Sequence, residues 1–138
     1  MRQAHGRLTI ATRGAGLVEV TDEVTAWLDA QDIADGLLTV FCRHTSASLL
    51  INENAAPAVR RDLERYFQRL APESRDYEHD DEGPDDMPAH LKTALTNVSI
   101  GIPVLDGRMV LGTWQGLYLF EHRAAPHRRT LALHVIGE

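Results

Sequence analysis

Residues 37–51 read LLTVFCRHTSASLLI, two apolar runs on either side of a short polar segment. The first run, Leu37 to Cys42, is rich in β-branched and aromatic residues and follows the turn signal Asp35-Gly36, so it predicts a buried strand. The second run, Leu49 to Ile51, predicts another short strand. Two strands this close together indicate a core built on a sheet, with the polar residues 43–48 at its margin.

The rest of the chain places helices between strands without a regular βαβ rhythm. The pattern therefore favours an α+β fold with an antiparallel, β-sandwich-like core and two to three packed helices, in a single domain over residues 1–138. Thr21 is expected to cap the first helix and Asn52-Glu53-Asn54 the second. Asp106-Gly107 predicts a tight hairpin. We expect strands at 8–12, 17–20, 37–42, 49–51, 98–105, 109–113, 117–121 and 130–136, and helices at 21–32, 55–72 and 87–95.

Charge is concentrated in one part of the chain. The formal net charge is −6, but residues 73–86 alone carry −7, so the remainder is close to neutral. A near-neutral surface with one acidic segment argues against nucleic acid or an anionic membrane as the main partner. No apolar run is long enough to cross a bilayer and no signal peptide is visible. The single cysteine, Cys42, lies in an apolar run, and a reduced, cytoplasmic setting fits it.

The acidic segment also contains histidines. Residues 77–90 read YEHDDEGPDDMPAH, in which His79 and His90 enclose a run of carboxylates interrupted by Gly83-Pro84. Imidazole nitrogen and carboxylate oxygen are the ligands of divalent cations, so this segment is a candidate metal site. The alternative is an acidic surface loop in which the histidines have no special role.

A second polar group lies at residues 44–48, between the two apolar runs. His44, Thr45, Ser46 and Ser48 combine an imidazole with three hydroxyls, which could bind an oxyanion or hold a metal-bound water. The alternative is a surface hairpin whose hydroxyls bond their own backbone. The local sequence favours that alternative.

Four segments taken together resemble a known family. They are HTSASL with INEN at residues 44–54, His79 with DDMPAH at 85–90, Ile102-Pro103 with Gly107, and LGTWQG at 111–116 with Glu121. This ordered set is similar to the YjbQ family of uncharacterised proteins, also called secondary thiamine-phosphate synthase. The resemblance covers nearly the whole chain.

The resemblance implies a β-sandwich-like α+β protein that forms a homotrimer, with a divalent-metal or anion site near a subunit interface. It also implies a weak activity that joins a pyrimidine diphosphate to a thiazole phosphate. A metal-dependent hydrolase of a phosphorylated small molecule and a non-catalytic metal- or anion-binding protein stay open as alternatives. The expected partner is a small phosphorylated metabolite, and the expected cofactor is a divalent ion, zinc or magnesium.

The same resemblance, with the chemistry of the residues, gives a set of candidate site residues. Trp114 offers a flat surface for a ring and Gln115 a polar group to read its edge, although Trp114 could instead be a core or interface aromatic. Glu121 could instead be a buried partner of an arginine or histidine. The candidate metal ligands are His44, His79, Asp86 and His90; the candidate catalytic residues are His44, Glu53 and Glu121; and the candidate anion- or substrate-binding residues are Thr45, Ser46, Ser48, Asn52, Trp114, Gln115 and Gly116.

Overall fold

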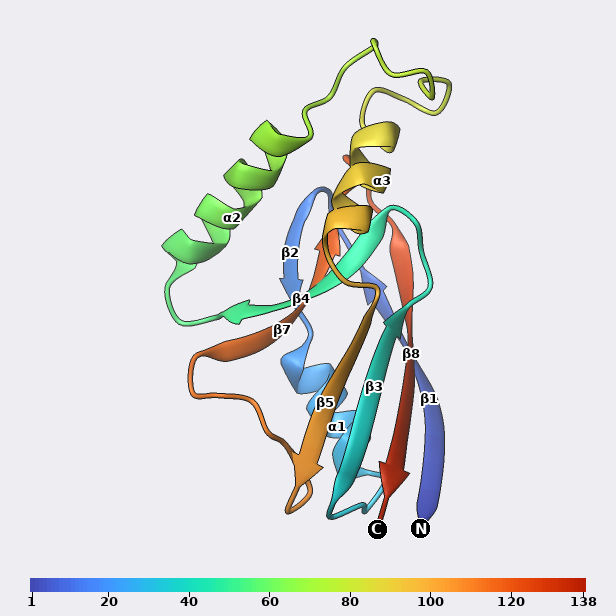
Figure 1. Ribbon diagram of the computed structural model, residues 1–138, viewed down its shortest axis with the longest axis vertical. Coiled ribbons are helices and arrows are strands. Elements are labelled where there is room, and N and C mark those ends of the chain that lie inside the picture. Colours follow the sequence, from blue (N-terminus) through green and yellow to red (C-terminus); the bar gives the residue numbers. More distant parts are fainter.

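The computed structural model describes residues 1–138 and contains two antiparallel sheets and three helices (Figure 1). It confirms the predicted α+β class with a sandwich-like core. One sheet has the order β1 (Arg2–Ala11), β8 (Arg128–Gly137), β3 (Gly36–Cys42), β5 (Ser99–Leu105), β6 (Arg108–Met109), and the other has the order β2 (Gly16–Glu19), β7 (Gln115–Glu121), β4 (Ala47–Glu53). The helices are α1 (Thr21–Asp29), α2 (Pro57–Leu70) and α3 (Asp86–Leu95). None of these helices is both long and apolar enough to span a membrane.

The main core lies between the two sheets and is closed by α1. It takes buried side chains from both sheets, such as Leu38 and Val40 of β3 and Leu117 of β7. On the other face of β3, Leu37 and Phe41 are 46 % and 43 % exposed. The prediction of a buried strand at 37–42 is therefore right for one face only, because an antiparallel sheet can cover one face with core and leave the other open.

The start of α1 differs from the prediction. Val20 occupies the cap position, and no side chain caps the helix. The Thr21 hydroxyl instead donates to Glu19 Oε2 at 2.8 Å and accepts from the backbone N–H of Leu117 at 2.9 Å. Thr21 thus ties α1 to β7. Trp27, partly buried, packs against the core.

The helix α2 lies against the outer face of the three-stranded sheet (Figure 1). Pro57 is at its first turn, where a missing N–H costs nothing. Leu63 and Phe67 contact a small cluster formed by Tyr118, Phe120 and Leu17, yet no residue of α2 is fully buried. No side chain caps α2, so the predicted cap at 52–54 is wrong. The helix covers the sheet incompletely.

The hairpin after β5 has the predicted turn. Asp106 and Gly107 have φ values of 51° and 77°, as the mirror-image turn of a two-residue hairpin requires. The strand that follows, β6, is only two residues long, so the predicted strand at 109–113 is wrong beyond Met109. The next residues form a loop closed by a bond from Gln115 N to Gly112 O at 3.0 Å.

The helix α3 stands at one end of both sheets, beneath the loop that carries the acidic segment (Figure 1). It begins at Asp86, one residue before the prediction. Its far end is anchored by backbone pairing between Leu49 of β4 and Asn97, and by a bond from Cys42 N to Val98 O at 2.7 Å. These anchors hold α3 at a fixed place beside β3 and β4.

Candidate functional site

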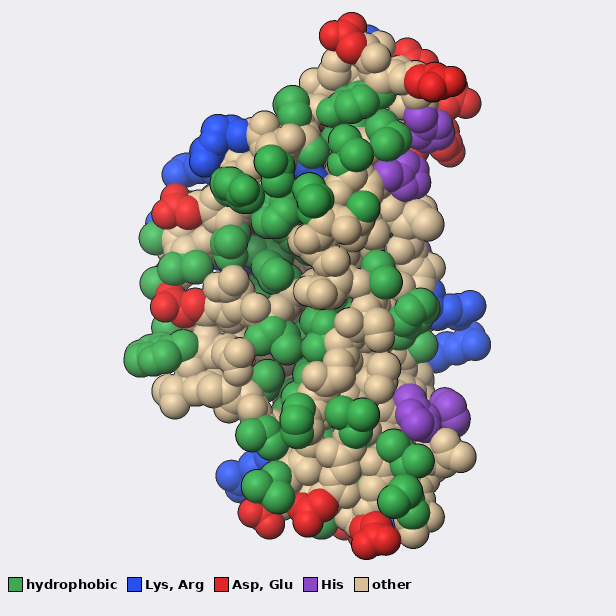
Figure 2. All heavy atoms as spheres, viewed as in Figure 1, with side chains coloured by type: hydrophobic (Ala, Val, Ile, Leu, Met, Phe, Trp, Pro, Cys, Tyr) green, Lys and Arg blue, Asp and Glu red, His purple; other side chains and the backbone are tan.

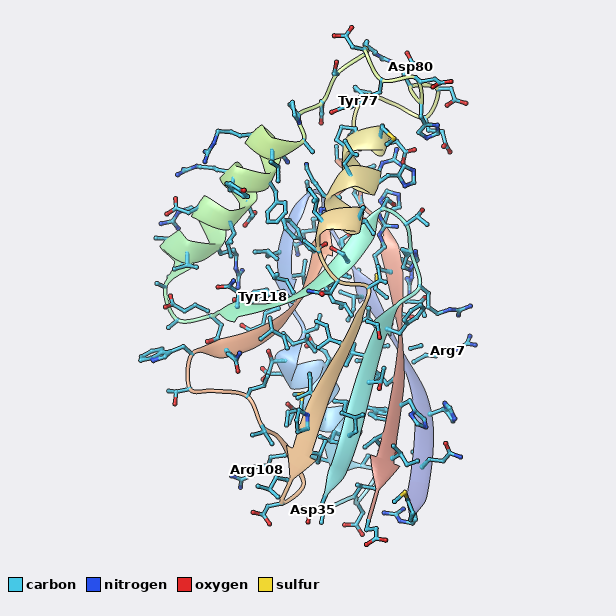
Figure 3. All side chains as sticks on the ribbon, viewed as in Figure 1. Arg7, Asp35, Tyr77, Asp80, Arg108 and Tyr118 are labelled. Atoms are coloured by element: carbon cyan, nitrogen blue, oxygen red, sulfur yellow. The ribbon has the colours of Figure 1, made fainter.

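Three side chains of the acidic segment converge at the start of α3. Asp86 Oδ2 lies 2.6 Å from His79 Nε2 and 3.2 Å from His90 Nε2. Asp86 and His90 are four residues apart on α3 and so share one face of the helix, while His79 approaches from the loop. Figure 2 shows histidine side chains beside the acidic group at the top of the molecule, and Tyr77 and Asp80 mark the loop in Figure 3.

The orientation of the His90 ring is fixed by the backbone of another segment. His90 Nδ1 donates to the carbonyl oxygen of Thr45 at 3.0 Å. Because a carbonyl can only accept, Nδ1 carries the proton, and Nε2 of the neutral ring presents a lone pair. This lone pair faces an oxygen of Asp86 at 3.2 Å, so the pair requires a proton or a cation between the two atoms.

Asp86 is held in place by Arg123. The side chain of Asp86 is only 5 % exposed, and Arg123 Nη1 binds its Oδ1 at 2.8 Å, which leaves Oδ2 for the histidines. Arg123 Nε also donates to Asp85 Oδ2 at 3.0 Å, and Nη2 donates to the Glu82 carbonyl oxygen at 2.9 Å. The guanidinium therefore holds the Asp86 and Asp85 carboxylates and the Glu82 carbonyl of the acidic segment in place.

The charges of this group favour ionised side chains. Burial would raise the pKa of Asp86, but the hydrogen bond from His79 and the charge of Arg123 outweigh it and lower that pKa. The hydrogen bond to Asp86 raises the pKa of His79, and the nearby carboxylate charges add to this effect. Without a metal, the imidazolium of His79 and the carboxylate of Asp86 form an ion pair.

The donor set fits a divalent transition ion. Two imidazoles and one carboxylate are a known ligand set of catalytic zinc sites, which keep a further position open. Ligand atoms of a tetrahedral zinc ion are about 3.3 Å apart, and the 3.2 Å contact of Asp86 Oδ2 with His90 Nε2 matches this spacing. The 2.6 Å contact of Asp86 Oδ2 with His79 Nε2 is a hydrogen-bond distance, which an ion between the two atoms would lengthen. Glu82 Oε2, 3.2 Å from His79 Nε2, is exposed and within reach as another ligand.

A pocket of about 610 Å³ adjoins His90 on the side away from the acidic loop. It lies between the end of β3 and α3, with Phe41 and Val98 as apolar walls and Arg43, His44 and Thr45 as polar ones. An organic ligand in this pocket would have His90 at its edge.

The structure does not bring His44 into the ligand group. His44 Nε2 accepts the backbone N–H of Thr130 at 2.8 Å, so this lone pair is already used. Burial, and next the charge of Arg129, lower the pKa of His44, which keeps the ring neutral. The predicted metal ligands therefore separate, with His79, Asp86 and His90 together and His44 in the neighbouring pocket.

The structure also separates the hydroxyl-bearing residues that were predicted to bind an anion together. Thr45 lines the pocket. Ser46 Oγ accepts from Arg129 Nη2 at 3.0 Å, and Ser48 Oγ lies 2.9 Å from His122 Nε2. Both serines are buried and bonded to other side chains, so they do not form an anion cradle with Thr45.

Another set of predicted residues lies at the far end of the three-stranded sheet. Asn52 pairs with Gly116 and Glu53 with Gln115, whereas the other ends of β4 and β7 carry Ala47 and Glu121. Six residues of extended strand span about 20 Å. Trp114 is 63 % exposed there. Within one chain these residues cannot share a site with His79 and His90.

Glu121 is a structural ion-pair partner in this fold, the alternative considered from the sequence. Its carboxylate is fully buried and paired with Arg129 through both oxygens, and Thr12 Oγ1 donates to it at 2.6 Å. Burial would raise its pKa, but the bonds from Arg129 and Thr12 lower it. With both oxygens occupied, Glu121 has no free position for a proton transfer to substrate, so its predicted catalytic role is corrected.

Sequence reasoning did not identify Arg123 as a support for the metal ligands. Its partners lie 37 to 41 residues away, and only the fold brings them together. Charge offered a weak signal, because a segment of net −7 needs a nearby cation.

Known proteins resemble this chain over nearly its whole length. A sequence model of the family described as "UPF0047 protein YjbQ-like" matches residues 6–138. A UPF0047 protein of Synechocystis sp. is 50 % identical over 99 % of this chain and 94 % of its own length. UPF0047 protein YjbQ of Escherichia coli O157:H7 is 45 % identical over 95 % and 96 %.

Solved structures also resemble this chain. An uncharacterised conserved protein of the yjbq/upf0047 family from Clostridium acetobutylicum has a TM-score of 0.87 at 34 % identity, covering 94 % of this chain and 98 % of its own. A hypothetical protein from Aeropyrum pernix K1 has a TM-score of 0.89 at 32 % identity, covering 98 % and 99 %. The chain therefore belongs to the YjbQ-like UPF0047 family.

Proposed function

We propose that this chain is a divalent-metal-dependent enzyme that acts on a small phosphorylated metabolite, with His79, Asp86 and His90 as metal ligands. The observation that carries the proposal is the support behind two of these ligands. The Thr45 carbonyl fixes the ring of His90, and Arg123 fixes Asp86. Such supporting bonds set the tautomer and direction of metal ligands.

Two imidazoles beside one carboxylate favour zinc or a similar transition ion over magnesium, which prefers oxygen ligands and keeps several waters. In this role the ion supplies positive charge to phosphate oxygens. The surrounding segment is strongly acidic and would repel a phosphorylated ligand by itself. Binding of the substrate therefore depends on the ion, which reverses the local charge.

The reaction that we propose first is the one implied by the family resemblance, the secondary thiamine-phosphate synthase reaction. The bond from the pyrimidine methylene carbon to the diphosphate oxygen breaks, diphosphate leaves with the electron pair, and the thiazole nitrogen forms the new C–N bond. This step requires charge stabilisation of the leaving group rather than a protein nucleophile. Arg43 lines the pocket beside His90 and adds positive charge, and Phe41 and Val98 offer apolar surface to a ring.

A hydrolase of one phosphorylated small molecule is the second candidate. It is favoured by the position that three protein ligands leave open, since a water there could be activated for attack. We further propose a cytoplasmic homotrimer. The buried free thiol of Cys42 fits a reducing compartment. The open face of the five-stranded sheet exposes Leu37, Phe41 and Leu105, apolar surface that a subunit contact would cover.

The test is a pair of assays on the purified protein with zinc, with magnesium and with EDTA. The transferase predicts a C–N-bonded product that requires both the pyrimidine diphosphate and the thiazole phosphate. The hydrolase predicts phosphate release from one substrate alone. His79→Ala and His90→Ala should abolish either activity, whereas His5→Ala, at an exposed histidine of β1, should not. Activity that survives in EDTA and in both variants would refute the proposal.

A further inference from the structure

Lys92 is the only lysine in the sequence; every other cationic side chain apart from the histidines is an arginine. It is also 3 % exposed, although lysine is among the residues most rarely buried. On α3 it follows His90 by two residues, so it points about 200° around the helix from His90. Lys92 thus lies on the face of α3 away from the candidate metal ligands, toward α2.

The ammonium group of Lys92 has one side-chain partner. Nζ donates to Gln68 Oε1 at 3.3 Å, and no other acceptor in the chain lies within hydrogen-bond distance of it. An ammonium has three N–H donors, so two of them have no partner in the protein. Buried donors are normally paired, so Lys92 can donate to an acceptor that a ligand brings.

His122 is the opposite case, a buried acceptor without a partner. Thr96 Oγ1 donates to the carbonyl oxygen of Lys92 at 2.8 Å, which uses its only proton. Ser48 Oγ, 2.6 Å from Thr96 Oγ1, is therefore the donor in that contact, and it accepts in turn from His122 Nε2–H at 2.9 Å. Burial lowers the pKa of His122 to about 3, so the ring is neutral at pH 7. Nδ1 then carries a lone pair, and this atom is buried with no partner.

Lys92 and His122 both line a hollow of about 430 Å³ between α2, α3 and the end of β7. It exists because α2 covers the sheet incompletely, and Figure 2 shows apolar side chains gathered in the depression between α2 and α3. Phe67 and Phe120 also line it, edge to face with ring centres 5.2 Å apart. A water molecule takes up about 30 Å³, so the hollow has room for a ligand much larger than a single bridging water.

The other polar groups of the hollow disfavour an anionic ligand. Glu64 and Glu121 line it, and both oxygens of Glu121 are already bonded to Arg129. An anion would meet the carboxylate of Glu64, and its oxygens would face the lone pair of His122 Nδ1. A neutral ligand that carries one acceptor and one N–H donor side by side matches Lys92 and His122.

We propose that this hollow binds a neutral aromatic carboxamide. Its carbonyl oxygen accepts from Lys92 Nζ, an amide N–H donates to His122 Nδ1, and its ring packs against Phe67 and Phe120. One carboxamide group thereby pairs a buried donor and a buried acceptor that the chain itself leaves unpaired. The site is separate from the candidate metal centre, on the opposite face of α3.

The test compares benzamide with acetophenone, which has nearly the same shape and a carbonyl but no N–H donor. Protein labelled with ¹³C-lysine gives a single Cε signal, because Lys92 is the only lysine. In EDTA, which removes any dependence on the proposed metal, benzamide should shift this signal saturably. It should bind about tenfold more tightly than acetophenone, which leaves Nδ1 unpaired, and more tightly than benzoate. No saturable shift, equal affinities for benzamide and acetophenone, or tighter binding of benzoate would overturn the assignment.

Calorimetry on two variants tests the two contacts separately. His122→Phe keeps a ring but removes Nδ1, so it should bind benzamide no more tightly than acetophenone. Lys92→Met removes the donor to the carbonyl oxygen that both ligands share, so it should weaken both about tenfold. Arg61→Met, at an exposed residue of α2 outside the hollow, should keep the native affinities for both. A native preference for benzamide in His122→Phe, or native affinities in Lys92→Met, would refute the proposed contacts.

Discussion

The carbonyl oxygen of Thr45 accepts a hydrogen bond from His90 Nδ1 at 3.0 Å, across 45 residues of sequence. This contact turns the other ring nitrogen toward Asp86 and makes His90 a ready ligand. It also explains why HTSAS and DDMPAH, two of the segments that carry the family resemblance, have to lie together: the first supplies the brace and the second the ligands.

The support from Arg123 should be measurable in metal affinity. Arg123→Met frees Asp86 to rotate and leaves Asp85 with only the backbone N–H of Ala124 as a partner. Loss of such a supporting contact costs about 10–100-fold in metal affinity. Competitive zinc titration measures the change. Arg128→Met, at an exposed arginine of β8, is the matched control and should retain native affinity. Equal affinities of the two variants would show that Arg123 does not position the ligand.

Anion binding should depend on the metal. Because the segment at 73–86 has a net charge of −7, the metal-free protein should bind inorganic diphosphate much more weakly than the zinc-loaded protein. Calorimetric titration with diphosphate, before and after EDTA treatment, gives the comparison. The same affinity in both states would contradict a metal clamp for phosphate.

The buried ion pair between Glu121 and Arg129 should dominate local stability. Glu121→Gln leaves the Arg129 guanidinium buried without a counter-ion, which costs about 3–5 kcal/mol of unfolding free energy. Glu138→Gln, which removes an exposed contact with the N-terminus, should change it by less than about 1 kcal/mol. Urea unfolding measures both. A loss below about 1 kcal/mol for Glu121→Gln would contradict the structural role.

His122 should make the fold sensitive to mild acid. Its folded pKa of about 3 is below the ordinary 6.5, so below pH 6.5 the unfolded chain gains a proton that the folded state rejects. Stability is therefore lost as pH falls, by about 2 kcal/mol between pH 7 and 5. The groups packed against the ring are Lys92, Glu121 and Arg129, and the lowered pKa of Glu121 keeps its carboxylate ionised over this range.

The measurement is urea unfolding at both pH values. His122→Gln keeps a polar group toward Ser48 but does not titrate, so its loss of stability between pH 7 and 5 should be smaller by about 2 kcal/mol. His5→Gln should lose as much stability between pH 7 and 5 as the native protein does. If His122→Gln loses as much stability as the native chain, the ring is not held neutral by burial.

Much of the fold could be predicted because it follows local patterns. The strand at 37–42, the helix with Leu63 and Phe67 on one face, and the Asp106-Gly107 turn depend on periodicity and turn chemistry, which neighbouring residues determine. The capping predictions at Thr21 and Asn52–Asn54 failed because tertiary contacts decided those positions. Thr21 bonds a strand almost a hundred residues away.

The candidate site could be predicted in part for the same reason. His79, Asp86 and His90 lie within twelve residues, so their convergence follows from one loop and one helical turn. The separation of the far-end residues, including Trp114, depends on strand direction, which motif order does not reveal. Lys92 and His122 have their partners in other elements. Only the composition pointed to Lys92, because it is the single lysine in a chain that is otherwise rich in arginine.

Metal content of the purified protein tests the central proposal most directly. Elemental analysis should find one divalent ion per chain in the native protein, and His79→Ala, Asp86→Asn and His90→Ala should each lose it while His5→Ala keeps it. Absence of metal from native protein that has been exposed to zinc, or variants that retain it, would contradict the assignment of His79, Asp86 and His90 as a metal centre.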